Sequence, residues 1–166
     1  MKSVYLWLLL AFPFVLSAQR ESVSIQGMEL SYALRSDSID ITLSAPTRGW
    51  VGIGFNKVNS IVGSDLILFH IVENKSEVLD MFVLSAGNPK PDHELGGSTA
   101  AVIKQASEKG NRTIIDFSIP LRSKDPNDFP LEPGKDFWLI LAYSTHDEFD
   151  HHSRMRRHIQ YRFDKK

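Results

Sequence analysis

The stretch GWVGIGFN, residues 49–56, carries the most informative pattern in the chain. Gly52 and Gly54, with Gly49 just before them, leave one face of a strand nearly bare, because successive side chains of a strand point to opposite faces. Glycine inside a strand marks either a bend or bulge of the backbone or a place where another group lies close. We therefore expect a β-strand here that either bends or holds a flat group against its glycine face.

Most of the remaining chain has the same strand-like character. Seven further segments are short, rich in β-branched and aromatic residues, and separated by turns that contain Asn, Gly, Asp or Pro. They are YALRSDSIDITLSA (32–45), SDLILFHIV (64–72), EVLDMFVL (77–84), AAVIKQAS (100–107), RTIIDFSIPL (112–121), DFWLILAYS (136–144) and RHIQYRF (157–163). Their regular spacing predicts an all-β fold, a two-sheet antiparallel β-sandwich of immunoglobulin-like type with about 9–11 strands.

Two of these segments, residues 64–72 and 137–143, are almost continuously apolar. Such strands are either central strands covered on both faces or strands whose outer face covers a ligand. His70 lies within the first of them. A histidine in this setting is either packed and hydrogen-bonded or a ligand, and both interpretations stay open.

The first eighteen residues have the order of a secretory signal peptide. A lysine near the start is followed by an apolar run from Val4 to Leu16 and by small residues before Gln19. The run is short for a membrane span, and an uncleaved signal anchor is the alternative. We expect residues 1–18 to be removed and residues 19–166 to form one domain without stable membrane insertion. The mature protein would then be secreted, to a periplasm or to the extracellular space.

The composition argues against several classes of function. The chain has 19 Lys and Arg against 20 Asp and Glu, a net charge of −1, and offers no electrostatic reason to bind nucleic acid or an anionic membrane. It has no cysteine, so its stability depends on core packing and it has no thiolate ligand. No GxSxG, P-loop or HExxH motif occurs. We expect a binding or electron-transfer module and not an enzyme.

The stretch FDHHSRMRRH, residues 149–158, holds three of the six histidines. With His146 and the acidic residues around it, this stretch offers nitrogen and oxygen donors that suit zinc or copper. On a strand, His151 and His152 would point to opposite faces, so at most one of them would serve a given site. The stretch is therefore either a cofactor or metal site that uses His152, or a solvated charged segment.

The order of several motifs resembles the DOMON family. GWVGIGFN is followed by VGSD at 62–65, LDMF at 79–82, IDFSIPL at 115–121 and the histidine-bearing last segment. This family includes the cytochrome domain of cellobiose dehydrogenase and domains of dopamine β-hydroxylase. The resemblance covers Val23–Phe163. It implies an extracellular β-sandwich with a pocket at one side for b-type heme or a sugar.

The resemblance also implies axial ligands for heme. In heme-binding members, a Met shortly before the GSD-type aspartate and a His near the C-terminal strands ligate the iron. The resemblance assigns the His to His152 or its neighbour His151. The Met position holds Ile61 and Val62, which do not coordinate iron. The remaining alternatives are ligation by His152 alone and a second ligand from Met81, Met28, His70 or His93.

The resemblance and the glycine strand together predict a pocket. Its expected residues are Trp50, Gly52, Gly54, Asp65, His70 and Tyr143. In one hypothesis the pocket holds b-type heme, for electron transfer to a separate redox partner protein or for heme sensing. In the alternative the module is heme-free and binds a carbohydrate or other small ligand that stacks on Trp50 or Tyr143. Asp80, Asp92 and Glu94 would line that cleft. A purely structural adhesion domain would require an exposed apolar patch.

Overall fold

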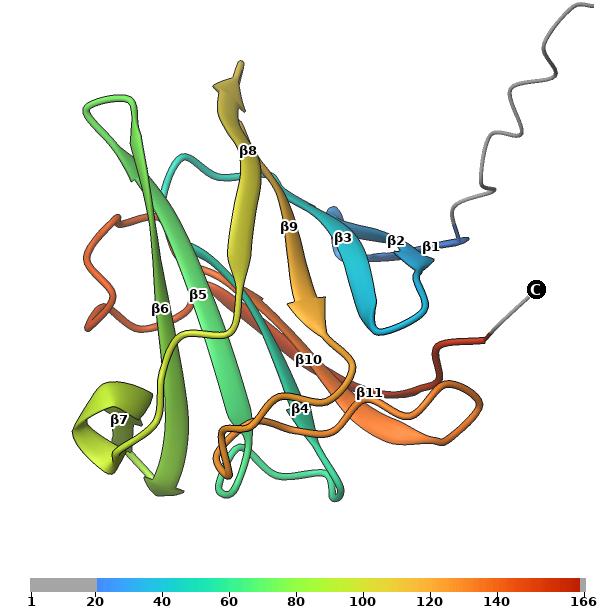
Figure 1. Cartoon of the computed structure of the whole chain (residues 1–166). Helices are drawn as coiled ribbons and strands as arrows, with labels where there is room; N and C mark the ends of the chain where they lie inside the picture. The colour runs from blue at the N-terminus through green and yellow to red at the C-terminus, as the bar shows by residue number, and fades with distance from the viewer. Residues whose placement is uncertain (1–20, 165–166) are drawn as a thin grey trace, which may run out of the picture.

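The computed structural model describes residues 21–164 and shows two antiparallel sheets packed face to face (Figure 1). One sheet has the order β1-β2-β3-β9-β8 and the other the order β11-β10-β4-β5-β6-β7. The first contains β1 (Glu21–Ile25), β2 (Met28–Leu34), β3 (Ser38–Ala45), β8 (Val102–Lys109) and β9 (Arg112–Pro120). The second contains β4 (Val51–Asn56), β5 (Asp65–Val72), β6 (Lys75–Ser85), β7 (Asn88–Pro91), β10 (Phe137–Tyr143) and β11 (Met155–Tyr161). A short 3-10 helix, η1 (Asp92–Leu95), follows β7.

The prediction of an all-β, two-sheet sandwich is confirmed. The glycine strand is β4, and the two apolar segments are β5 and β10, which flank it in the middle of the six-stranded sheet. Two edge strands, β1 and β7, were not predicted. Both are short, and β7, with the sequence NPKP, has no β-branched or aromatic residue. The predicted signal peptide, residues 1–18, lies outside the described residues.

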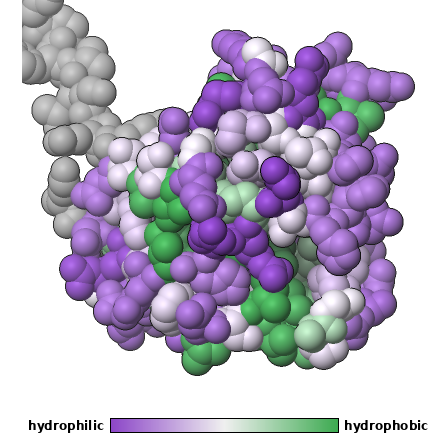
Figure 2. Space-filling model, turned by 180° about the vertical axis from the view of Figure 1, so that it is seen from behind, coloured by the Kyte–Doolittle hydropathy of each residue, from purple (hydrophilic) through white to green (hydrophobic). Residues whose placement is uncertain are grey.

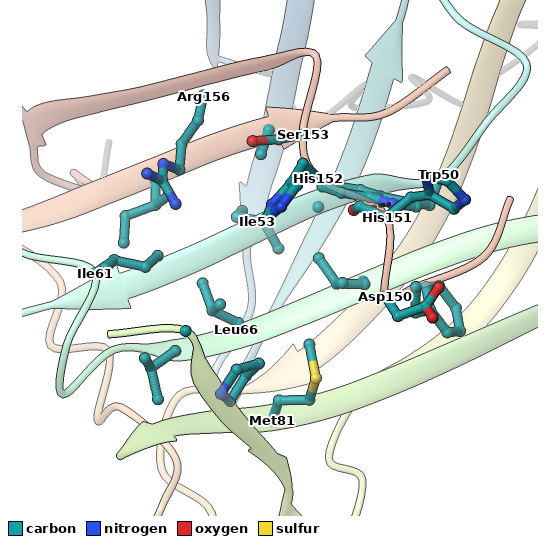
Figure 3. Close-up of a pocket in the computed structure, with 18 residues that line it drawn as sticks. Trp50, Ile53, Ile61, Leu66, Met81, Asp150, His151, His152, Ser153 and Arg156 are labelled. Atoms are coloured by element: carbon teal, nitrogen blue, oxygen red, sulfur yellow. Dashed lines mark hydrogen bonds between the residues drawn. The ribbon is translucent and has the colours of Figure 1, made fainter. Parts of the chain in front are cut away.

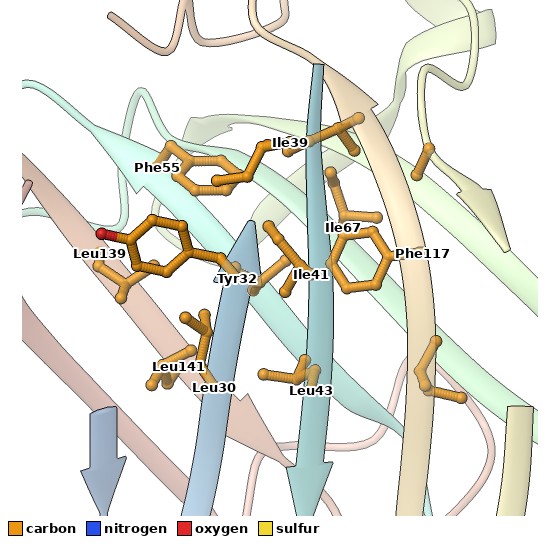
Figure 4. Close-up of a cluster of buried hydrophobic side chains, with 14 of the residues drawn as sticks. Leu30, Tyr32, Ile39, Ile41, Leu43, Phe55, Ile67, Phe117, Leu139 and Leu141 are labelled. Carbon is orange, nitrogen blue, oxygen red and sulfur yellow. The ribbon is translucent and has the colours of Figure 1, made fainter. Parts of the chain in front are cut away.

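The core lies between the two sheets and is built by alternation along each strand. In β9 every second residue is buried, so Ile115, Phe117 and Ile119 face the other sheet. The rings of Phe117 and Phe69 contact each other across the sandwich, with centroids 4.5 Å apart. Figure 4 shows Phe117 beside Ile41 and Ile67 in this core. Burial of each such side chain stabilises the fold by about 1.5–3 kcal/mol. With no cysteine in the chain, this packing carries the stability.

One close chain contact fixes the segment that bears the histidines. The backbone of Trp50 exchanges hydrogen bonds with that segment, because its N–H donates to the His146 carbonyl at 2.9 Å and its carbonyl accepts from the Ser144 N–H at 2.9 Å. A Cβ at Gly49 would lie 2.5 Å from the backbone of His146, so only glycine permits this approach. The GW pair therefore joins the start of β4 to the chain that leaves β10.

The described surface is mostly polar. Figure 2 shows apolar side chains in separate patches on one face and not as one continuous area. The exposed large apolar residues come from several different segments, and they are Val58, Val62, Val72, Leu84 and Val102. Scattered residues of this kind are normal for a protein surface and do not favour the adhesion hypothesis. Within residues 21–164, no helix has the length and apolar character that crossing a membrane requires.

We expect Phe117→Ala to lower the free energy of unfolding by about 3–5 kcal/mol, because it leaves a cavity opposite Phe69. The exposed Val102→Ala on neighbouring β8 is the control and should change it by less than about 0.5 kcal/mol. Urea denaturation of both variants measures the effect. A loss below about 1 kcal/mol for Phe117→Ala would contradict this account of the core.

Candidate functional site

A cavity of about 370 Å³ lies on the outer face of the six-stranded sheet (Figure 3). Its floor is apolar and comes from three neighbouring strands, with Gly52 on β4, Leu66 and Leu68 on β5, and Ile140 and Ala142 on β10. The segment between β10 and β11 covers one side of it. This volume falls within the range of small-ligand pockets, about 300–1,000 Å³.

The glycines of β4 make room for this floor. A Cβ at Gly52 would lie 2.4 Å from Leu68 Cδ2, and a Cβ at Gly54 would lie 2.3 Å from Leu66 Cδ2. The pairing of β4 with β5 and with β10 runs without a register shift, so the strand has no bulge. Of the two sequence interpretations, close approach by another group therefore holds. The approaching groups are the side chains of Leu66 and Leu68, which line the apolar floor.

The backbone of the histidine-bearing segment is anchored to the sheet. Trp50 Nε1 donates a hydrogen bond to the His151 carbonyl at 3.2 Å, and Ser144 Oγ donates to the His152 carbonyl at 3.2 Å. Both imidazoles belong to residues that line the cavity and are exposed. Figure 3 shows His151 next to Trp50 and His152 near Ile53. The fold therefore presents two histidines at the mouth of an apolar cavity.

Ile61 and Met81 line the cavity away from the histidines (Figure 3). Met81 lies on β6 beside Leu66 and is 6% exposed. Ile61 lies in the loop before β5, which is tied down by two side chains. Asn56 Nδ2 donates to the Val62 carbonyl at 3.0 Å, and Ser64 Oγ donates to the Ile61 carbonyl at 2.6 Å. The serine of the GSD motif thus holds Ile61 at the cavity wall.

The structure brings together five of the predicted site residues. These are Trp50, Gly52, Met81, His151 and His152, all of which line the cavity. Gly54 accommodates Leu66 in the floor. His70 lies outside the lining and supports it, because its ring stacks on Phe149 at 4.2 Å and its Nδ1 lies 2.7 Å from the Asp147 carbonyl oxygen.

Three predicted residues lie elsewhere. Met28 is fully buried in the core between the sheets, away from the cavity. Tyr143 and Asp65 belong to strands that line the cavity, yet their side chains are on the inner face, because side chains alternate along β10 and β5. Tyr143 follows the core residue Leu141 by two positions, and Asp65 precedes the core residue Ile67 by two. The predicted pocket was therefore wrong for these residues.

Sequence reasoning missed several lining residues, chiefly Phe149 and Arg156. Arg156 pairs with Ala142 in the β10–β11 ladder, so alternation from the buried Met155 would have placed it on the outer face. Phe149 lies in an irregular segment, where periodicity gives no information.

The potential metal-binding side chains of this segment group differently from the sequence prediction. Potential ligand atoms of His146, Glu148 and His151 lie within 4.8 Å of one another, and the rings of His146 and His151 stack at 4.1 Å. All three residues are exposed. His152, the predicted metal ligand, is not part of this group. The two adjacent histidines thus face different surroundings.

A profile of the DOMON domain matches residues 24–144, most of the described chain. The chain belongs to the DOMON family. Among its relatives, the DBH-like monooxygenase protein 2 of Homo sapiens is 31% identical over 117 residues, which are 70% of this chain and 22% of that protein. The Mus musculus counterpart is 29% identical over 120 residues, 72% of this chain and 18% of that protein. The chain spans about a fifth of the length of these curated relatives.

Two solved structures share the DOMON fold with this chain. The cytochrome domain of Myriococcum thermophilum cellobiose dehydrogenase matches with a TM-score of 0.62 and 13% identity, over 87% of this chain and 82% of that one. The cytochrome b domain of pyranose dehydrogenase from Coprinopsis cinerea matches with a TM-score of 0.60 and 11% identity, over 81% and 76%. At this level of identity the likeness establishes the fold.

The DOMON domain also contains a group of five carboxylates behind the cavity sheet. They are Asp65 on β5, Asp80 on β6, Asp92 in η1, and Asp125 and Asp128 in the loop between β9 and β10. Asp80 pairs with Ile67 in the β5–β6 ladder, and both face the inside of the sandwich. The Phe129 N–H donates to Asp65 Oδ2 at 2.8 Å, and the Ala100 N–H donates to Asp80 Oδ2 at 2.9 Å. Asp80 and Asp92 therefore do not line a sugar cleft on the surface.

Burial changes the acidity of this group. Burial raises the pKa of Asp80 to about 7, against the opposing effect of the Ala100 N–H. Burial also raises the pKa of Asp92 to about 7, and the charges of Asp125 and Asp128 add to this. The pKa of buried Asp65 lies well above its ordinary value for the same reason, with Asp80 contributing. The fold thus favours the protonated forms of these carboxyl groups.

We expect the metal-free protein, kept in EDTA, to become less stable as pH rises from about 4 to about 7. The folded pKa of Asp80 and Asp92 exceeds the unfolded value, so their stabilisation is complete below pH 4 and is lost as pH passes 7. The loss should be on the order of 3 kcal/mol. Urea denaturation across this range measures it, and the Asp80→Asn, Asp92→Asn double variant should flatten the dependence. An equally steep dependence in that variant would contradict the prediction.

Proposed function

We propose that this DOMON domain binds b-type heme in the outer-face cavity, as a module for electron transfer or heme sensing. The observation that carries the proposal is the position of His152 in the lining of a cavity whose floor is apolar. Imidazole is a common axial ligand of heme iron. The faces of a macrocycle require apolar contacts, and Leu66, Leu68 and Ile140 at the cavity supply apolar side chains.

The residues at the cavity fit heme in three respects. The imidazole of His152 and the thioether of Met81 are the donor types of a His/Met site. The floor residues are apolar, which suits the ring faces. Arg156 at the lining offers a guanidinium that matches a carboxylate such as a heme propionate.

We propose that His152, in preference to His151, would bind the heme iron. The ring of His151 stacks on His146 in the exposed cluster, which leaves His152 as the histidine of the pair outside that cluster. The hydrogen bond from Ser144 to the His152 carbonyl holds the backbone that carries this imidazole. Bound heme would supply one-electron chemistry. The residues of the chain would orient the ligand and exclude water from one ring face.

The proposed second ligand is Met81. Its side chain lines the cavity from β6, and Ile61 occupies the position where the family resemblance implies a Met. A thioether from a buried strand would raise the reduction potential relative to a site with His alone. If His152 alone held the iron, bound heme would suit the sensing of a small ligand.

The family resemblance implies an iron-binding Met at the position of Ile61, and isoleucine does not coordinate iron. This substitution supports a second candidate function, a heme-free binding module. The ligand of such a module would be a small apolar compound and not a sugar. Trp50, the expected stacking platform, is only 4% exposed, and Tyr143 faces the core. Both hypotheses use the same cavity.

We further propose that the protein acts outside the cytoplasm, after removal of residues 1–18, and that its electrons pass to a separate redox protein. The relatives named as monooxygenases are several times longer than this chain. No catalytic activity of its own is proposed for the domain.

Heme titration of the purified protein tests the proposal. We expect one heme per chain, with a Soret band and sharp α and β bands after reduction. His152→Ala should weaken heme binding about tenfold or more, because the axial ligand is lost. Met81→Leu should retain heme and lower the reduction potential, while Ile61→Met should strengthen binding or raise the potential.

The matched control is His146→Ala, which removes an exposed imidazole outside the cavity lining and should leave the heme spectrum unchanged. A folded protein that stays colourless and does not bind added heme would overturn the heme proposal and leave the apolar-ligand hypothesis. Loss of heme in His151→Ala with no effect of His152→Ala would reassign the ligand.

A further inference from the structure

The segment between β10 and β11 carries a group of potential metal ligands that the proposed heme site does not use. Ligand atoms of His146, Glu148 and His151 lie within 4.8 Å of one another, and all three side chains are exposed. The two imidazole rings are nearly parallel, at an angle of 11°, with centroids 4.1 Å apart. Histidine nitrogen and carboxylate oxygen are both ordinary ligands of zinc. The segment thus brings two kinds of zinc ligand to one point on the surface.

Trp50 holds the backbone of both histidines in place. Its backbone N–H donates to the His146 carbonyl at 2.9 Å, and its Nε1 donates to the His151 carbonyl at 3.2 Å. The His151 N–H donates to the Glu148 carbonyl at 3.1 Å and closes the turn between the ligands. Figure 3 shows the side chain of His151 next to Trp50. The fold itself, and not only closeness in sequence, therefore sets the positions of the three ligands.

The ligand atoms of this group have no competing partner in the protein. Within residues 21–164, no hydrogen bond reaches a ring nitrogen of His146 or His151. In the same part of the chain, Glu148 takes no part in an ion pair. Both ring nitrogens of His70, by contrast, lie within hydrogen-bond distance of oxygen atoms. The nitrogen atoms of the exposed pair are therefore available to a metal.

The charge of the segment favours a cation at this point. Asp147, Glu148 and Asp150 place three carboxylates among the four residues between the two histidines. No lysine or arginine of the described chain forms an ion pair with any of the three. A divalent cation would therefore be attracted to the segment and would balance charge that the protein leaves unpaired.

We propose that His146, Glu148 and His151 bind one divalent transition-metal ion of the zinc type. Zinc–ligand distances of about 2.0–2.2 Å place two ligand atoms of one ion at most about 4.4 Å apart. The present spacing is close to this, and rotation of the exposed side chains closes the difference. Calcium and magnesium prefer oxygen ligands alone, so the two imidazoles select against them. The proposal does not rest on heme binding.

A metal ion here would fix the cover of the cavity. The ligands bracket the turn of the segment that covers one side of the cavity, and His151 also belongs to the lining. A bound ion would keep the His151 imidazole in the surface group. His152 would then be the histidine of the pair that is left for a ligand in the cavity.

Zinc titration of the heme-free protein tests the proposal. The protein is stripped with EDTA, returned to metal-free buffer at about pH 7.5, where imidazoles can give up their proton to a metal, and titrated with ZnCl2. NMR spectra of the imidazole groups identify the histidines that respond, and competition with a chelating dye gives affinity and stoichiometry. We expect one zinc per chain at this group, with the signals of His146 and His151 shifting together and that of His93 unchanged.

Three substitutions locate the site. His146→Ala, Glu148→Gln and His151→Ala each remove one ligand and should weaken zinc binding about tenfold or more, since even outer-shell partners of metal ligands contribute this much. All three positions are exposed, so each variant should keep the Tm of the unmodified protein in EDTA. His93→Ala removes an exposed histidine outside the group and is the matched control, with zinc binding unchanged.

The double variant His146→Ala, His151→Ala gives the decisive result. Zinc binding that persists in it with unchanged affinity would overturn the proposal, because the ion would then lie elsewhere. Absence of zinc binding by the unmodified protein would overturn it as well. Neither result bears on the heme proposal, which the heme titration tests separately in the cavity.

Discussion

The two-faced character of β4 is the constraint on which the rest of this structure depends. Val51, Ile53 and Phe55 fill the core toward the five-stranded sheet, while Gly52 and Gly54 leave room for side chains of β5 on the outer face. If larger residues replaced the glycines, Leu66 and Leu68 would be displaced and the apolar floor would change shape. One strand thus builds the sandwich and the cavity at the same time.

Sequence alternation predicted the fold better than it predicted the site. In β9 every second residue is buried, and in β4 glycine alternates with the large apolar residues that face the core. β5 and β10 are apolar on both faces, so their pattern does not tell which face is inside. That ambiguity explains why Asp65 and Tyr143 were expected in the pocket although they face the core side. Counting the alternation from a core residue on the same strand, such as Ile67 or Leu141, would have placed Asp65 and Tyr143 on the inner face.

The acidic group could not have been found from one sequence. Its members come from β5, β6, η1 and the loop between β9 and β10, so their meeting depends on long-range packing. The GSD motif ends at Asp65, which precedes the cavity residue Leu66. The LDMF motif contains Asp80, which precedes the cavity residue Met81. The motifs that mark the DOMON family in this chain therefore place the acidic group and the cavity on opposite faces of one sheet.

The central claim is that the outer face of the six-stranded sheet is the ligand site. Anomalous diffraction at the iron edge, from crystals grown with heme, locates the iron directly. The account predicts one iron peak above the floor formed by Leu66 and Leu68, within bonding distance of His152. A peak at the exposed cluster of His146 and His151, or between the two sheets, would contradict it.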